Sequence, residues 1–197
     1  MSAPDALPVA LVDPLRAEHT VLQVALEVLG QTAGLVARRL PVPPAAVLEL
    51  VRLISQFGDQ EHIAKEEQAL VPALHAAGMP LRYGPLALML LEHQRSRELS
   101  REMVRAAGDL GRAAAQDAFC GAVRDYLALI ETHIEREEKL LYPMADQVVA
   151  PERVLAVREA FARVDRARES GGCEQVKARL EELRGWIAAT AVPPPAP

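Results

Sequence analysis

Two stretches of the sequence match each other, HIAKEEQALVP from His62 and HIEREEKLLYP from His133. In each stretch a histidine stands four residues before a glutamate, Glu66 in the first and Glu137 in the second. Residues four apart lie on one face of an α-helix, so each stretch presents an imidazole and a carboxylate together. These side chains are nitrogen and oxygen donors for a metal ion.

Two further histidines complete the pattern, and a glutamate directly precedes each of them. His19 lies in RAEHTVL and His93 lies in LLEHQRS. The separation of His19 from His62 is similar to that of His93 from His133. The chain therefore contains two matching halves, each with a single histidine followed by a His-x-x-x-Glu.

The helical faces that carry these residues are apolar. Leu15, Leu22 and Leu26 share a face with His19, which predicts that the four histidines and two glutamates point into a core. Buried carboxylates are held by pairing or by metal ions. A donor set without thiolates favours iron, with manganese and zinc as alternatives. Six ligands exceed what one tetrahedral ion needs, and they suit two close metals with an open position.

The elements that must position these residues are helical, because Ala, Leu, Glu and Arg dominate the sequence. Proline and glycine divide it into long blocks at about 11–40, 44–75, 85–110 and 113–149, with shorter helices at about 151–169 and 174–189. This order predicts an all-α fold, an antiparallel up-down four-helix bundle at 11–149 with a C-terminal helical extension at 150–190. A Pro-rich disordered tail follows at 191–197. Pro72 and Pro143 predict a bend late in the second and fourth blocks.

Composition excludes several classes of protein. The net charge is −5 with both signs interspersed, which argues against nucleic acid or an anionic membrane surface as partners. Two cysteines are too few for a disulfide framework or a Cys-based zinc site. The apolar N-terminus lacks a basic region and is a poor signal peptide, and no window reaches the ~20 uncharged apolar residues of a transmembrane helix. We expect a cytoplasmic protein.

On this pattern the sequence resembles the hemerythrin-like family, in its HHE cation-binding branch with the motif H…HxxxE…H…HxxxE, over about residues 11–149. The matching positions are His19, His62 with Glu66, His93, and His133 with Glu137. The resemblance implies an antiparallel four-helix bundle that holds two iron ions (Fe²⁺/Fe³⁺). It implies Glu66 and Glu137 as bridging carboxylates, with an oxo or hydroxo bridge.

The sequence departs from the oxygen-carrying members of this family at two positions. The carriers have a second histidine four residues after that of the third helix, where this chain has Arg97. They also use a carboxylate five residues after the fourth-helix histidine, which is Glu138 here. We prefer Glu137 as the ligand, because Glu138 lies about 140° from the direction of His133.

With one histidine fewer, the site is better suited to react with a small oxidant (peroxide, dioxygen or nitric oxide) than to carry oxygen. Catalase- or peroxidase-like activity is one form of this hypothesis. The alternative is an iron or oxygen sensor, or an iron-binding regulatory protein, without turnover. A metal-free structural bundle is a third interpretation, which the repeated ligand set disfavours.

The glutamates next to the predicted ligands receive minor roles from the sequence. Glu67 and Glu138 are expected to be solvated or paired with basic neighbours, with support of the ligands as the alternative. Glu18 and Glu92 face away from the histidine stripes of their own helices and are interpreted as surface charges.

Four other residues complete the predictions. Tyr126 is expected to line the pocket and to hydrogen bond a site carboxylate, and Arg97 to lie at the rim, where it could gate access. His75 is interpreted as a surface residue at a helix end. Trp186, in the amphipathic stretch RLEELRGWIAA, marks the C-terminal helices as the place for a homodimer or partner contact.

Overall fold

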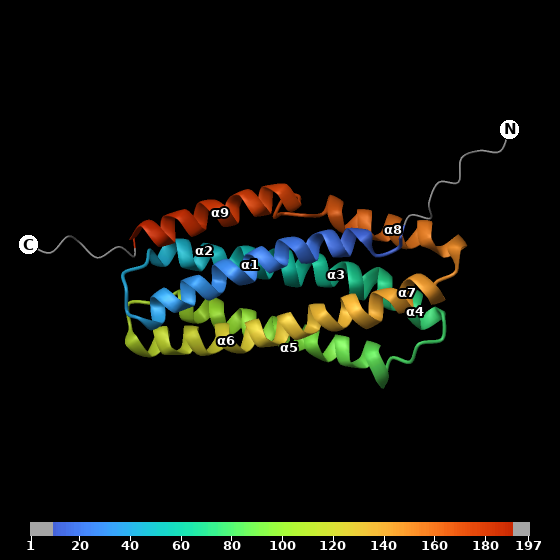
Figure 1. The fold of residues 1–197 in the computed structure, drawn as a ribbon, viewed down its shortest axis with the longest axis horizontal. Helices are drawn as coiled ribbons and strands as arrows, with labels where there is room; N and C mark the ends of the chain where they lie inside the picture. The colour runs from blue at the N-terminus through green and yellow to red at the C-terminus, as the bar shows by residue number, and fades with distance from the viewer. Residues whose placement is uncertain (1–9, 191–197) are drawn as a thin grey trace, which may run out of the picture.

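The computed structural model describes residues 10–190, and all regular secondary structure in that range is helical (Figure 1). Its helices are α1 (Asp13–Ala37), α2 (Pro44–Ile54), α3 (Ile63–Lys65), α4 (Val71–Ala76), α5 (Gly84–Ala107), α6 (Ala113–Arg136), α7 (Tyr142–Val148), α8 (Pro151–Arg166) and α9 (Cys173–Thr190), with π-helical segments η1 (Ser55–His62), η2 (Glu66–Leu70) and η3 (Glu137–Leu141). The predicted all-α class is confirmed. The tail predicted at 191–197 lies outside the described residues.

The helical segments lie alongside one another along the long axis of the molecule (Figure 1). The run from α2 to α4 is continuous through η1 and η2, and α6 continues through η3 into α7. α5 packs on α6, and α1 packs on both α6 and α9. α8 lies against α3 and η2, so the two C-terminal helices cover one side of the longer segments (Figure 1).

Two apolar clusters form the core, and the predicted ligands lie between them. On α1, Leu15 belongs to one cluster and Leu22 to the other, with His19 between them. On α5, Met89 and Leu99 flank His93 in the same way. Burial of one such side chain contributes roughly 1.5–3 kcal/mol, which offsets the cost of burying polar residues between the clusters.

α1 is long and apolar enough to cross a membrane by length and composition, which corrects the expectation that no segment reaches this threshold. The core helix of a soluble protein passes the same test. In this fold α1 places Leu15, Val21 and Leu29 in the apolar core, each 0% exposed. It also carries His19 into the interior, so its apolar character serves the packing of the core.

The bends predicted at the two prolines take the form of π turns. The N–H of Val71 donates to the carbonyl of Glu66, and the N–H of Tyr142 to that of Glu137, in each case five residues back. A proline ring clashes with the carbonyl four residues before it, and a wider turn ahead of Pro72 relieves that clash. Each π turn therefore begins at a predicted ligand glutamate and ends two residues before its proline.

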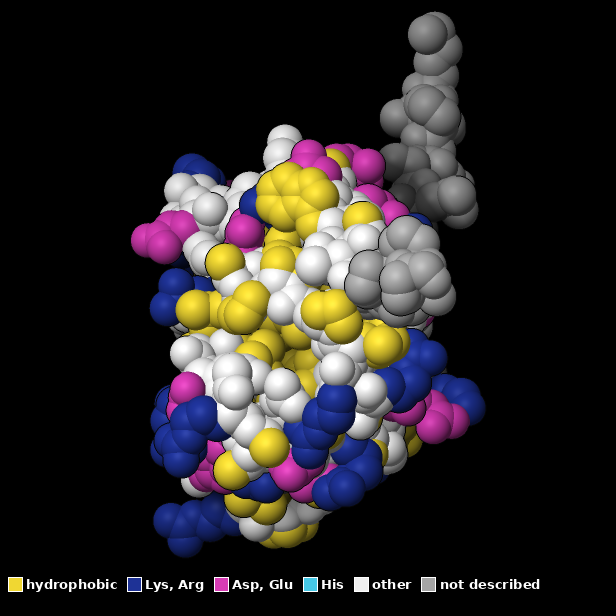
Figure 2. Space-filling model, turned by 90° about the vertical axis from the view of Figure 1, so that its left-hand side faces the viewer, with side chains coloured by type: hydrophobic (Ala, Val, Ile, Leu, Met, Phe, Trp, Pro, Cys, Tyr) yellow, Lys and Arg dark blue, Asp and Glu magenta, His cyan; other side chains and the backbone are white. Residues whose placement is uncertain are grey.

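Apolar side chains gather at the end of the molecule where the C-terminal end of α9 and the start of α2 meet (Figure 2). Trp186 is 51% exposed there and lines a shallow groove with Pro43 and Ala46. The guanidinium of Arg179 lies 4.7 Å from the centre of its indole ring. The expected partner contact through the C-terminal helices stays a prediction.

Candidate metal centre

The structure brings the predicted ligand side chains from four helical segments into one buried cluster. None of them is more than 3% exposed. They are His19 on α1, His62 at the end of η1, Glu66 at the start of η2, His93 on α5, His133 on α6 and Glu137 at the start of η3.

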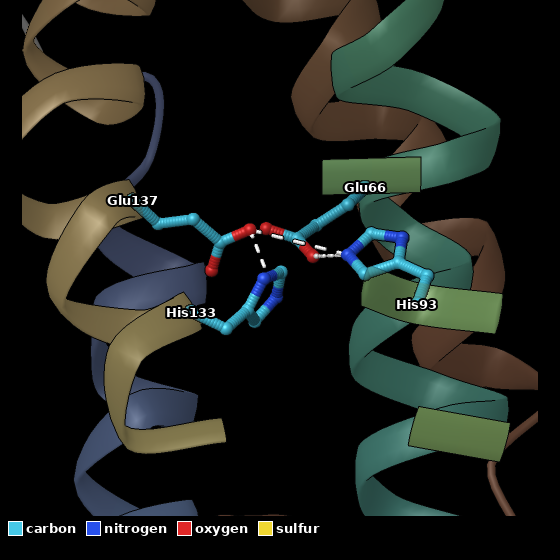
Figure 3. Close-up of side chains that lie close together, drawn as sticks. All are labelled: Glu66, His93, His133 and Glu137. Carbon is cyan, nitrogen blue, oxygen red and sulfur yellow. Dashed lines mark ion pairs between the residues drawn. The ribbon is translucent and has the colours of Figure 1, made fainter. Parts of the chain in front are cut away.

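The first group of donor atoms comes from Glu66, His93, His133 and Glu137 (Figure 3). One donor atom from each of these four side chains lies within 4.8 Å of the others. Glu66 Oε2 is 3.1 Å from His93 Nε2, and Glu137 Oε1 is 3.1 Å from His133 Nε2. The four side chains point toward one another from three helical runs, since His133 and Glu137 lie on the continuous run from α6 through η3 (Figure 3).

The second group consists of His19, His62 and Glu137. Glu137 Oε2 is 3.2 Å from His19 Nε2, whereas its other oxygen faces His133. Glu66 Oε2 lies 3.8 Å from His62 Nε2. Glu137 therefore has one oxygen toward each group, which is the geometry that a carboxylate bridge between two ions needs.

Most of these donor atoms have no hydrogen-bond partner among the described residues, although they are fully buried. The atoms are His62 Nε2, His93 Nε2, His133 Nε2, Glu66 Oε2 and both carboxylate oxygens of Glu137. A buried polar atom without a partner costs about 1–3 kcal/mol. Several of them converging on one place fit a cation bound by imidazole and carboxylate donors.

Each histidine directs Nε2 toward the cluster, and its Nδ1 contacts a glutamate from another helical segment. His62 Nδ1 lies 3.1 Å from Glu18 Oε2, and His133 Nδ1 lies 2.9 Å from Glu92 Oε2. Both glutamates are buried, at 1% and 8% exposure. Their interpretation as surface charges is wrong, because each points away from its own histidine and toward the histidine of the next segment.

Glu67 and Glu138 contact Nδ1 of the two remaining histidines, His93 and His19. Glu67 Oε1 is 3.1 Å from His93 Nδ1, and Glu138 Oε1 is 2.7 Å from His19 Nδ1. An Nδ1–H that donates to a carboxylate leaves the lone pair of a neutral ring on Nε2, so these contacts orient all four histidines to bind metal through Nε2. The structure thus favours the supporting role for Glu67 and Glu138.

Each supporting glutamate also pairs with a basic side chain. Arg97 donates to both oxygens of Glu67, at 2.9 and 2.7 Å. The other pairs are Arg16 with Glu138, Arg136 with Glu92, and Lys65 and Arg168 with Glu18. Arg97, expected at the rim, is one-third exposed and acts on His93 through Glu67.

The two inner carboxylates have opposite pKa shifts. Burial raises the pKa of Glu137 well above its ordinary value, and the nearby Glu66 carboxylate raises it further. Burial also acts to raise the pKa of Glu66, but the imidazoles of His62 and His93 outweigh it and lower this pKa. Without a cation, one carboxyl of the pair is ionised and the other holds a proton, because two like charges this close are unfavourable.

Burial lowers the pKa of His133 to about 3 and also lowers the pKa of His19, which keeps both imidazoles neutral. For His93, burial is outweighed by the nearby carboxylates of Glu66 and Glu67, and its pKa is raised. Neutral imidazoles are the metal-binding form, so His19 and His133 are ready to ligate at neutral pH.

The tyrosine that contacts the site carboxylates is Tyr142. Its hydroxyl donates to Glu66 Oε1 at 2.7 Å and lies 3.2 Å from His19 Nε2. In an α-helix Tyr142 would lie about 140° from Glu137, five residues earlier. The π turn η3 brings residues five apart close to one another, and this places the phenol at the site.

Tyr126, the tyrosine expected at the pocket, is also buried. It lines a small cavity together with His62, His133 and Ser96. Burial and the neighbouring carboxyl of Asp59 raise the pKa of its phenol. His75 is exposed near the end of α4, as expected, with Nδ1 2.9 Å from the carbonyl of Met79.

A cavity of about 270 Å³ leads to the cluster from the surface between α5 and the η3 segment. His133 and Glu137 lie among its lining residues. Leu88, Met89 and Leu140 make much of the remaining wall apolar.

These features define an all-α protein with a buried histidine–glutamate cluster that can hold metal. The chain matches the profile of the hemerythrin HHE cation-binding domain over residues 10–145. The match covers more than half of the chain, and the chain belongs to this family.

Curated relatives come from mycobacteria. The chain is 25% identical over 157 residues to the uncharacterized proteins Rv1995 and MT2051 of Mycobacterium tuberculosis and Mb2018 of Mycobacterium bovis. The match covers 79% of this chain and 61% of each relative, so the chain spans less than two thirds of their length. No solved structure gives a significant match.

Proposed function

We propose that the chain is a non-haem di-iron protein whose site reacts with a small oxidant: peroxide, dioxygen or nitric oxide. In this proposal α1, the α2–α4 run, α5 and the α6–α7 run form an antiparallel up-down four-helix bundle. The metal ligands are His19, His62, Glu66, His93, His133 and Glu137.

The observation that carries the proposal is the position of the Glu137 carboxylate. Its two oxygens are buried without hydrogen-bond partners among the described residues, and they face different histidine groups. A carboxylate in that position is costly without a cation, and metal ions held by the two histidine groups would satisfy both oxygens. Glu66 is the second candidate bridge, because its Oε2 lies near both His93 and His62.

When bound, the iron pair supplies redox change and Lewis acidity to the oxidant. The residues of the chain do the rest. The four histidines are oriented by their Nδ1 hydrogen bonds to glutamates, so little reorganisation is needed on binding. Tyr142 Oη holds a proton beside Glu66 and the His19 ring, where it can serve as a donor to a bound oxidant.

Access for the oxidant is provided by the cavity between α5 and η3. It reaches His133 and Glu137, and its apolar wall suits small uncharged molecules. Glu92 and Arg136, which form an ion pair, line the same cavity. Glu92 also contacts Nδ1 of His133.

The test is peroxide consumption by the iron-reconstituted protein, followed as oxygen evolution or as loss of peroxide with a reductant present. We expect turnover in the parent protein and its loss in His133→Ala. Glu131→Gln, an exposed change on the same helix, is the matched control and should retain turnover. Equal rates in His133→Ala and the parent would contradict a reaction at this site.

A second candidate function is an iron or oxygen sensor without turnover. One observation favours it: residues from the α8–α9 region contact Glu18, the partner of His62. A change at the site could therefore reach the C-terminal helices. Negligible peroxide turnover, together with a change in helicity or oligomeric state on iron loading, would favour the sensor over the enzyme.

A further inference from the structure

The junction between α8 and α9 lies against the supporting partner of one site histidine. Arg168 forms ion pairs with both Glu18 and Asp165. Lys65, at 1% exposure, pairs with Glu18 and lies 2.5 Å from Asp165 Oδ1. Because Glu18 holds His62 Nδ1, a continuous chain of contacts runs from the C-terminal helices to the His62 ring.

A second attachment holds the backbone next to His62. Ser170 donates its N–H to Glu61 Oε1 at 3.0 Å and its hydroxyl to Glu61 Oε2 at 2.5 Å. Glu61, the residue before His62, is 4% exposed. Gly171 follows with φ +89°, a left-handed conformation that a side chain would strain, and this turn leads the chain into α9.

The two halves of the repeat differ at this point. Lys65 and Arg136 occupy the same position of the repeated motif, and each pairs with the glutamate that precedes the first histidine of its half. The side chains of Glu92 and Arg136 are 10% and 38% exposed, whereas those of Glu18 and Lys65 are 2% and 1% exposed. The α8–α9 junction is what covers the Glu18 side.

We propose that the α8–α9 junction, residues 165–170, is a clamp that positions His62 through Glu18. What the clamp does for metal binding rests on the proposed function. Metal retention by the His19–His62 group depends on the clamp, whereas metal retention by the Glu66–His93–His133–Glu137 group does not. Arg168 is a positioning residue, because it touches Glu18 and not the donor atoms. Without its guanidinium, Glu18 keeps one cationic partner and is free to rotate away from the imidazole.

The first test uses metal-free protein and NMR of the histidine side chains. In the parent protein, the Nδ1–H protons of His62 and His133 should both be protected from solvent exchange. In Arg168→Ala we expect exchange at His62 to accelerate about tenfold or more while His133 is unchanged, because local opening is confined to one side. Arg168→Lys should restore part of the protection, and Arg166→Ala, an exposed arginine two residues away, should change neither signal.

Two outcomes would overturn the clamp. One is an unchanged His62 signal in Arg168→Ala, and the other is an equal acceleration at His62 and His133, which would indicate a general loss of stability. If Arg168→Ala does not fold, Arg168→Gln provides the same comparison. It removes the ion pair between Arg168 and Glu18 and keeps a polar side chain at this position.

The second test titrates the metal-free protein with Co²⁺ and follows its absorption spectrum. We expect two binding steps in the parent, and in Arg168→Ala one of them weakened about 10- to 100-fold with the other unchanged. Equal weakening of both steps, or of neither, would contradict the clamp. If the parent protein binds no metal, the proposed function fails, and the NMR comparison still decides whether the junction positions His62.

Discussion

Glu18 directly precedes His19 in the chain, yet its carboxylate accepts a hydrogen bond from the Nδ1 of His62, at 3.1 Å. The second half repeats this relationship, since Glu92 precedes His93 and accepts from His133 Nδ1 at 2.9 Å. In each half, the glutamate before the first histidine orients the ring of the second histidine. The repeat in the sequence is therefore a repeat of paired contacts between helices.

Glu92→Gln should weaken metal binding by about 10- to 100-fold, the usual effect of losing a carboxylate behind a histidine ligand. The amide can still accept a hydrogen bond, but it carries no charge to strengthen the imidazole as a donor. Competition with a chelator measures the affinity. Glu98→Gln, six residues later on α5, is the control. Equal affinities in the two variants would argue against the role of Glu92.

Glu137→Gln should abolish the binding of a metal pair and stabilise the metal-free protein. Because the pKa of Glu137 is raised in the folded state, the folded carboxyl holds a proton that the unfolded chain releases above about pH 4.3. Each unit of that shift costs about 1.4 kcal/mol of stability as the pH rises. The amide does not titrate and escapes this cost.

Chemical unfolding of metal-free Glu137→Gln at pH 7 measures the effect on stability. The parent protein and Glu131→Gln serve as references, because Glu131 is exposed on the same helix. A variant that is less stable than the parent, or one that still binds two metal ions, would refute the bridging role assigned to this carboxylate.

Metal binding should release protons and should strengthen as the pH rises. Glu137 and His93 both have raised pKa values in the metal-free protein, and both must lose their protons to act as ligands. The proton count follows from calorimetric titrations in buffers of different ionisation enthalpy. Affinity that does not change between about pH 5.5 and 7.5, with no protons released, would be inconsistent with these two ligands.

Tyr142→Phe should destabilise the metal-free protein by about 1–3 kcal/mol, because Glu66 Oε1 loses a buried hydrogen-bond donor. Tyr83→Phe is the matched control, since Tyr83 is 72% exposed and should tolerate the change. Unfolding free energies from denaturant titration compare the two. Equal values for both variants would show that the phenol does not support Glu66.

Hydrophobic periodicity and proline placement were sufficient to predict that the chain is helical, and the repeated motif singled out the six side chains that the structure brings into one buried cluster. The supporting glutamates could not be found in this way, because periodicity describes the faces of one helix. Glu18 lies off the His19 stripe, and only the position of the neighbouring helix shows that it reaches His62. The sequence did contain one indication of their role, because a glutamate directly precedes both His19 and His93.

Tyr142 escaped prediction for a different reason. An α-helical period places it off the ligand face, and the π turn at 137–141 moves it onto that face. The same turn leaves Leu140 48% exposed, although an α-helical period places it on the core side with His133. Pro143 predicted an irregularity at this point, but not the extra residue that rotates the following chain.

The central claim is that this histidine–glutamate cluster holds two iron ions, and iron stoichiometry tests it most directly. After anaerobic reconstitution and removal of loose metal, we expect two irons per chain, ferric charge-transfer absorption on oxidation, and loss of both properties in Glu137→Leu. A folded parent protein that retains no iron, or a Glu137→Leu variant that retains two with an unchanged spectrum, would contradict the account.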